Sequence, residues 1–453
     1  MFAPAPSAPA SPFRGDGLEP GMPPHWPPSD THHWNPMFMP KRLALAISGL
    51  FVLPSVLAAP PAQKVKPPVS QAYIDLATFS GGMPIPGGTG GLNTSFGMTQ
   101  AQSVGRWMDV VLLTRNNGRL KTATQSVPAG SKLAPVLNLL APEQGPAEPS
   151  GPEDTDTEPP KFDMPKGKMY LYWGCGAEVR KGQPLVIDLA NMAPSQLSKF
   201  FQNRSATTRV PQPAPGRPAW PNQRDNRRLP DGASLVGEHA FAGGGVVDGF
   251  RFHIDAEHDL MPAVEASRND EDKAVMFRWK PMQQASGWFV QSMGMRDAGK
   301  AQSGDMEMVY WTSSELPDMG MGLVNYQPNG AIGKWQKEKV LLPAGATECL
   351  APKEAVGAMS MSRVIAYGDE LDMAYPPRPK DPKATWEPQW NVKLRRKSVA
   401  SLMPGMGAAM QAAMAEQEET PQEKRAPAST QGIVKEAVTR GVVDALTRGL
   451  FGR

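Results

Sequence analysis

Between Lys166 and Lys397 the chain repeats short runs rich in β-branched and aromatic residues, with turn residues between them. This spacing, and the alternation of polar and apolar residues, are typical of strands with one buried face. No long apolar pattern with a period of about 3.6 residues competes with them. We therefore predict a mainly β protein with antiparallel sheets in one or two β-sandwich modules. The runs are KMYLYWG, PLVIDLA, SLVGEHAF, VVDGFRFHI, AVMFRW, GWFVQSM, MVYWTSS, GLVNYQ, KVLLPAG, RVIAYG and WNVKLR.

Three segments inside this region depart from the strand pattern. APSQLSKFFQN, Ala193 to Asn203, is predicted as a helix. The Pro- and Arg-rich insert from Arg209 to Gly232 is predicted as a long surface loop. The basic run KLRRK, Lys393 to Lys397, is interpreted as a solvated strand end. We expect no nucleic-acid partner, because such binding needs a concentrated basic face and the net charge is only +3.

A segment near the N-terminus has the pattern of a secretory signal peptide over residues 39–58. Lys41 and Arg42 precede the apolar run Leu43 to Leu53, and Val56 and Ala58 supply small residues before a cleavage site. The run is short for a membrane span, although an uncleaved anchor stays open as an alternative. We therefore expect an exported protein of the periplasm or the extracellular space.

The flanking regions are predicted to contain little folded structure. Residues 1–38 are rich in Pro and are interpreted as a disordered leader or a mis-assigned start, with translation beginning at Met37 or Met39. Residues 59–165 are Pro- and Gly-rich and are predicted to be mostly disordered, with a strand near 106–116 and a short element near Leu133 to Leu140. Residues 166–261 are then predicted as a β-rich module.

The C-terminal region, residues 398–453, is predicted as a helical tail. Small residues recur every four positions near its end, beside an apolar stripe. This pattern suggests a helix that docks on another helix or contacts a membrane surface through residues 432–453, and a frayed tail is the alternative. The small residues are Ala437, Gly441, Ala445 and Gly449.

Cys175 and Cys349 are the two cysteines of the chain, and export would take both to an oxidising compartment. We predict a disulfide between them, which closes a loop of 174 residues. In the chain-entropy model such a loop contributes on the order of 5 kcal/mol. A catalytic thiolate and a zinc site are less well supported, since no nucleophile signature surrounds Cys175 and zinc needs more ligands.

The stretch FRWKPMQQASGWFV resembles the start of a fibronectin type III module, an immunoglobulin-like β-sandwich. The matching residues are Phe277, Trp279, Gly287, Trp288 and Val290. Position 288 is usually Tyr in that family, and the later strands match poorly. The resemblance covers about residues 262–397 and implies a binding or spacing role without catalytic residues.

Two groups of residues are candidates for ligand contacts. His253, Asp255 and His258 lie within FRFHIDAEHDL, and their imidazole and carboxylate groups could gather around a divalent metal. The alternative is a polar strand face that runs into a charged turn, so we predict no metal and no cofactor. Trp386 and Trp390, in TWEPQW, could stack on sugar rings or could instead pack a strand edge.

Together these patterns favour an exported cell-envelope protein with a non-catalytic binding, adhesion or assembly role. Its expected partner is an envelope protein or a polysaccharide. The alternative is a secreted hydrolase acting on a cell-wall or polysaccharide substrate, with catalytic residues that the sequence does not identify. The sequence contains no GxSxG, HExxH or CxxC motif that would indicate an enzyme class.

Overall fold

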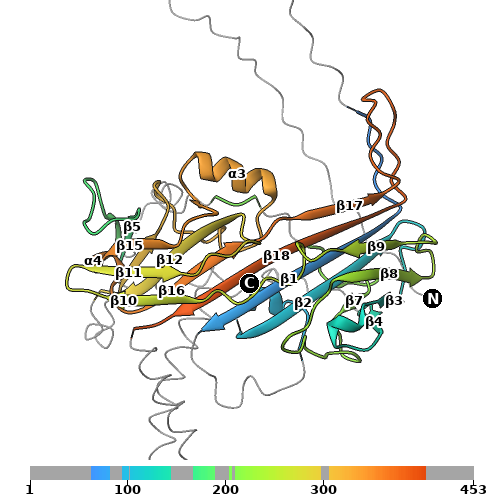
Figure 1. Cartoon of the computed structure of the whole chain (residues 1–453), viewed down its shortest axis with the longest axis horizontal. Helices are drawn as coiled ribbons and strands as arrows, with labels where there is room; N and C mark the ends of the chain where they lie inside the picture. The colour runs from blue at the N-terminus through green and yellow to red at the C-terminus, as the bar shows by residue number, and fades with distance from the viewer. Residues whose placement is uncertain are drawn as a thin grey trace, which may run out of the picture. The chain divides into compact units, whose positions relative to one another are not determined.

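The computed structural model describes residues 63–81, 94–101, 103–143, 167–188, 204–206, 210–296 and 306–404. The leader, the signal peptide, the helix at 193–203 and the part of the predicted helical tail beyond residue 404 lie outside these residues. Residues 398–402, predicted as the start of that tail, instead belong to a strand. The described part is mainly β, as expected, with one large mixed sheet and one small sheet (Figure 1). None of its helices is long and apolar enough to cross a membrane.

Fifteen strands of the described residues form the large sheet. Across the sheet they are β6 (Leu185–Asp188), β5 (Gly167–Trp173), β13 (Met306–Thr312), β12 (Gly287–Met295), β16 (Ala358–Tyr367), β18 (Trp390–Leu402), β1 (Ser70–Gly81), β2 (Gly105–Thr114), β7 (Ala219–Trp220), β4 (Val136–Leu140), β3 (Thr122–Ser126), β8 (Gly237–Gly243) and β9 (Arg251–Ile254). In addition, β14 (Leu342–Pro343) pairs with β12, and β17 (Leu371–Tyr375) pairs with β18. The small sheet contains β10 (Ala266–Asp270), β11 (Ala274–Trp279) and β15 (Glu348–Pro352).

The long strands β18, β1 and β2 lie side by side at the centre of the large sheet (Figure 1). β1 and β18 are parallel, from Ser70 opposite Trp390 to Gly81 opposite Ser401, and β5 and β13 are also parallel. The expectation of purely antiparallel sheets is therefore corrected to a mixed sheet. The two parallel pairs are possible because each joins segments with long connections between them, as parallel pairing requires.

β1 lies in the range 59–165, which the sequence analysis predicted to be mostly disordered. β2, β3 and β4 come from the same range, and the strand expected near 106–116 corresponds to β2. β1 was not predicted because the segments around it are rich in Pro and Gly. Its own sequence, SQAYIDLATFSG, is ordered by pairing with β18 on one edge and β2 on the other. The strands of the range 166–261 are not all neighbours: the pair β5 and β6 lies at one end of the strand order, the pair β8 and β9 at the other, and β7 between β2 and β4.

The first face of the central strands, which we name the apolar face, carries Ile74 and Leu76 of β1 and Leu394 of β18. These residues share one hydrophobic cluster with Leu137 of β4 and Phe250 beside β9. The large sheet is therefore curved, so that strands far apart in its strand order, such as β18 and β9, pack their apolar faces against each other.

The small sheet packs over another part of the large sheet. Phe277 lies 5.6 Å from Trp311, and Trp279 lies 5.4 Å from Trp288, measured between ring centroids. The predicted disulfide between Cys175 and Cys349 is confirmed, with Cα atoms 5.4 Å apart. It joins the turn after β5 of the large sheet to β15 of the small sheet.

Three local predictions differ from the structure. The insert at 209–232 is not a surface loop throughout, because β7 lies inside it and places Trp220 in the sheet at 1% exposure. Residues 322–327 form turns instead of a strand. Asn329–Lys337 forms the helix α3, which was not expected and which buries Ile332 and Trp335. The short helices α1 (Met98–Ala101) and α4 (Lys353–Val356) complete the helices used below.

Candidate functional site

The second face of the central strands, which we name the charged face, contains a buried ion pair. Side chains alternate along β1, so Asp75 points away from the face that carries Ile74 and Leu76. In the sheet register Asp75 lies opposite Arg395 of β18. Arg395 donates two hydrogen bonds to the carboxylate, at 2.7 Å from Nε to Oδ1 and 2.6 Å from Nη2 to Oδ2. Asp75 and Arg395 are 2% and 3% exposed, so water contributes little to their solvation.

Lys397 lies two residues further along the same face of β18 and is also buried. Its Nζ is 3.3 Å from the carbonyl oxygen of Val324 and lies over the rings of Tyr326 and Phe79, at 4.6 and 5.7 Å from their centroids. Burial lowers the pKa of Lys397 to about 7, although the carboxylate of Asp75 opposes this shift. The ring faces and the carbonyl partly replace the lost water around the ammonium.

Asp109 of β2 lies opposite Asp75 on the other edge of β1. Its carboxylate accepts hydrogen bonds from the backbone N–H of Gly97, at 3.0 Å, and from the hydroxyl of Thr99 in α1. Burial raises the pKa of Asp109 to about 7, and these hydrogen bonds reduce the shift without cancelling it. Buried carboxyl groups with a pKa near neutrality occur at functional sites and in structural networks alike.

The prediction that Lys393 to Lys397 forms a solvated strand end is wrong. Arg395 and Lys397 enter the charged face, and Arg396 points to the opposite face. There Arg396 donates to the carbonyl oxygens of Glu257 and Asp259, at 2.7 and 3.2 Å. The run is buried under segments that are distant in sequence and that supply its hydrogen-bond partners. The local sequence around residues 393–397 therefore could not indicate that burial.

The residues of the charged network are too enclosed to contact a substrate from solvent. Asp75, Asp109, Arg395 and Lys397 are each 2–3% exposed. The helix α3 and the turns before it cover neighbouring positions, since Trp335 and Leu323 share a cluster with Ala77 of β1 and its neighbours. We therefore interpret this network as part of the scaffold.

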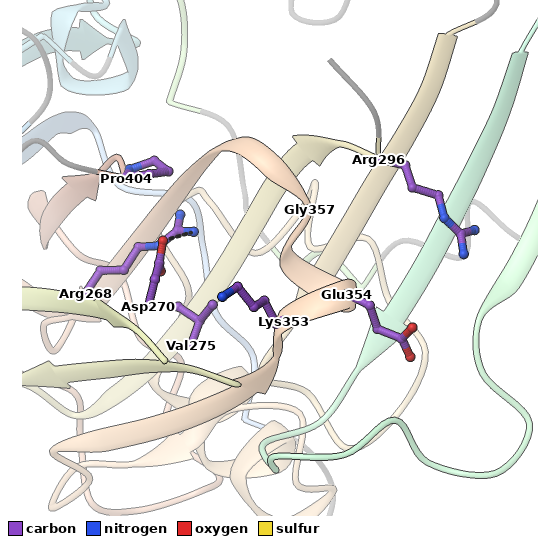
Figure 2. Close-up of a pocket in the computed structure, with 8 residues that line it drawn as sticks. All are labelled: Arg268, Asp270, Val275, Arg296, Lys353, Glu354, Gly357 and Pro404. Carbon is purple, nitrogen blue, oxygen red and sulfur yellow. Dashed lines mark hydrogen bonds and ion pairs between the residues drawn. The ribbon is translucent and has the colours of Figure 1, made fainter. Parts of the chain in front are cut away.

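A cavity of about 540 Å³ lies where the small sheet meets α4 and the end of β12 (Figure 2). Figure 2 shows charged side chains on both sides of α4 and the turn that follows it. We name this cavity the α4 cleft. It is lined by Arg268, Asp270, Val275, Arg296, Lys353, Glu354, Gly357 and Pro404.

Arg268 and Asp270 form a fixed wall of the α4 cleft. Arg268 donates from Nε and Nη2 to the two carboxylate oxygens of Asp270, at 2.7 and 3.3 Å. Its Nη1 donates to the hydroxyl of Ser360 at 2.8 Å. Because these bonds hold the guanidinium against the carboxylate, their opposite charges largely cancel, and we interpret the pair as a fixed support of the cleft.

Three other charged groups of the α4 cleft are available to a ligand. Arg296 lies over the ring of Tyr170, 4.5 Å from the centroid, and Lys353 donates one hydrogen bond to the carbonyl oxygen of Glu271 at 2.8 Å. Arg296 and Glu354 form no ion pair with a described residue, and both are exposed. The cleft can therefore offer a guanidinium, an ammonium and a carboxylate to a polar partner.

Gly357 shapes the cleft at the end of α4. Its φ of +78° lies in the region that favours glycine, and a Cβ atom there would be 2.9 Å from the carbonyl oxygen of Met295. The turn can therefore follow β12 closely only without a side chain at this position.

The residues proposed as metal candidates form two separate pairs. Nδ1 of His253 lies 2.8 Å from Glu238, and Nδ1 of His258 lies 2.7 Å from Asp255. Within the described ranges, no group of three His, Cys, Asp or Glu side chains is placed to hold a metal ion.

The two candidate stacking residues differ in their accessibility. Trp390 is 8% exposed because its ring lies between Phe250, at 5.0 Å, and Tyr375, at 6.0 Å. Trp386 is half-buried; its Nε1 donates to the carbonyl oxygen of Pro376, and Arg378 lies 5.6 Å from its ring. The exposed ring of this group is Tyr375, at 57%. Sequence reasoning missed it, because nothing around it distinguishes it from a core tyrosine.

No protein-family model matches the chain, and no curated protein matches it in sequence. Function must therefore be inferred from the geometry of this chain. Of the two sets of charged residues described above, the buried network is closed to solvent and the α4 cleft is open to it. The α4 cleft is the better candidate for a functional site.

Proposed function

We propose that this chain is an exported cell-envelope protein with a non-catalytic binding, adhesion or assembly role. The observation that carries the proposal is the α4 cleft. Its volume of about 540 Å³ falls within the range of sites for small molecules and short segments of a partner. Arg296, Lys353 and Glu354 present charges of both signs, which suits a polar segment of an envelope protein.

The proposal of export has two supports. Residues 39–58 have the composition of a signal peptide. The disulfide between Cys175 and Cys349 is consistent with an oxidising compartment, where such bonds persist.

We also propose that the small sheet and the strands beneath it form a β-sandwich module similar to fibronectin type III. The support is the placement of two residues of the sequence resemblance. Trp279 lies in the small sheet and Trp288 in the large sheet, and their rings are 5.4 Å apart. Such modules commonly serve as binding or spacing units, which agrees with a non-catalytic role.

Export is tested with a fusion of the full chain to a reporter enzyme that is active only outside the cytoplasm. We expect activity from the fusion, and a strong reduction when Lys41 and Arg42 are changed to Glu, because the positive segment of the signal is then lost. Absence of reporter activity from a fusion that is synthesised in full length would refute export.

The α4 cleft is tested with a photo-crosslinking amino acid placed at position 354 in cells that express the protein. We expect a discrete light-dependent adduct, lost when Arg296→Glu reverses a charge of the cleft. The control places the same amino acid at position 280, directly after β11, where the lysine side chain is 71% exposed. Equal adducts from the two positions, or none from 354, would count against the proposal.

A further inference from the structure

The hairpin between β17 and β18 extends beyond the sheet, with the segment before β1 beside it (Figure 1). We name residues 63–69 and 375–389 the arm. Its two segments are joined by backbone hydrogen bonds of 2.9 Å, from Lys66 to Trp386 and from Trp386 to Lys64. The side chain of Gln63 also donates to the carbonyl oxygens of Pro379 and Asp381. These bonds hold the arm in one conformation, which reduces the entropy cost of binding.

The arm is basic. It carries five exposed cations and two exposed carboxylates, so its net charge equals the +3 of the whole chain. Lys66 pairs with Glu387 at 2.6 Å. Lys64, Lys380 and Lys383 form no ion pair with a described residue, so their charges remain available to an anionic partner. The cations are Lys64, Lys66, Arg378, Lys380 and Lys383, and the acids are Asp381 and Glu387.

The arm also carries a rigid aromatic platform. Tyr375 is 57% exposed, and one side of its ring is supported by Trp390 and, behind it, by Phe250. A ring fixed in this way offers a flat apolar surface at little entropic cost, and a sugar ring has an apolar face that can lie on it. The same arm therefore carries several cations and a flat apolar ring, a combination that matches a polymer of acidic sugars.

We propose that the arm binds an acidic polysaccharide, with sugar carboxylates at Lys64, Lys380 and Lys383 and a sugar ring on Tyr375. The proposal rests on the proposed function, since it names the chemical class of an envelope partner. An anionic membrane fits the charge but not the apolar surface. Val65 is the one exposed large aliphatic residue in the arm, and an interfacial segment needs a broad apolar face.

The test measures binding of the purified full chain to polygalacturonate, with dextran as the neutral control. We expect affinity for polygalacturonate that falls as salt is raised from about 20 to 150 mM, because exposed charges are screened. The triple variant K64Q/K380Q/K383Q should lose at least about tenfold in affinity and most of the salt dependence. Tyr375→Ala should weaken binding several-fold and leave the salt dependence unchanged.

A matched variant, K121Q/K168Q/K181Q, removes three exposed lysines away from the arm. It should bind polygalacturonate as the unmodified chain does. Equal losses in the two triple variants, absence of binding, or tighter binding to phosphatidylglycerol vesicles than to polygalacturonate would each overturn the proposal. The measurement needs no export, so its failure is distinguishable from failure of the reporter fusion.

Discussion

Asp75 and Arg395 are 320 positions apart in the chain and form a two-point contact at the centre of the sheet. A buried ion pair seldom stabilises more than well-packed apolar residues would, because both charges lose their hydration. We infer that its role is to set the register of β1 against β18. If the pairing of β1 slipped by one residue, Asp75 would lie on the face that carries Leu76, within the apolar cluster.

Asp75→Asn should destabilise the protein strongly, because it leaves the guanidinium of Arg395 buried without its counter-charge. The expected loss is about 3–5 kcal/mol in the free energy of unfolding, measured by urea denaturation at pH 7. Glu265→Gln breaks the exposed pair with Lys280 and should cost less than about 1 kcal/mol. Similar losses in the two variants would show that Arg395 does not depend on Asp75.

Asp109 should make stability depend on pH in a direction opposite to that of most carboxylates. Its pKa is about 7 in the folded chain, against an ordinary value of 3.8. Between these values the folded state holds a proton that the unfolded state has released, so stability falls as pH rises. From pH 5 to pH 7 the free energy of unfolding should fall by about 2 kcal/mol relative to Asp109→Asn.

The measurement is a series of urea titrations of both proteins from pH 5 to pH 7. Asn retains an oxygen that can accept from Gly97 and Thr99, so the variant should fold. A constant difference in the free energy of unfolding between the two proteins across this range would contradict the protonation of Asp109.

Lys397 affects stability in the opposite direction at higher pH. Between its pKa of about 7 in the folded chain and its ordinary value of 10.5, the unfolded state binds a proton that the folded state has released, so stability rises with pH.

At the scale of elements, strands rich in apolar and aromatic residues were predictable, and strands that depend on distant partners were not. AVMFRW and GWFVQSM show this composition locally and correspond to β11 and β12. β1 and β7 lie among prolines and glycines and become strands only against β18, β2 and β4. The disulfide was predictable because two cysteines allow one pairing.

The candidate sites were less predictable than the strands. The α4 cleft joins groups from β10, β11, α4 and the ends of β12 and β18, and no sequence motif links these segments. Trp390 resembled a ligand platform in sequence, but Phe250 and Tyr375 cover it in the fold. Which aromatic ring faces solvent depends on packing between segments more than 100 residues apart.

Trp220 tests whether the insert at 209–232 is part of the core. It is 1% exposed and belongs to the main hydrophobic cluster. Trp220→Ala should cost about 3–5 kcal/mol and make the insert sensitive to limited proteolysis. The control is Trp386→Ala, which removes a half-buried ring of the arm and should cost clearly less. A surface loop at 209–232 would instead tolerate Trp220→Ala with little change in the unfolding midpoint.

At the scale of the whole molecule, the disulfide connects the two sheets across 174 positions of the chain. The double variant C175A/C349A should unfold at lower urea concentration, with a loss of up to about 5 kcal/mol, because the bond restricts the unfolded chain. The oxidised protein, unfolded without reductant, should show no reactive thiol, and mild reduction should reproduce the loss. Two titratable thiols in the unreduced protein would refute the bond.

β1 and β18, the first and last of the described strands, are neighbours at the centre of the large sheet. While the chain is being synthesised, residues 390–402 emerge long after residues 70–81. The middle of the molecule therefore cannot assemble until nearly all of the described chain has arrived. Until then β1 has an exposed edge, so the nascent chain should depend on holding chaperones and should lose its folded centre when shortened before residue 390.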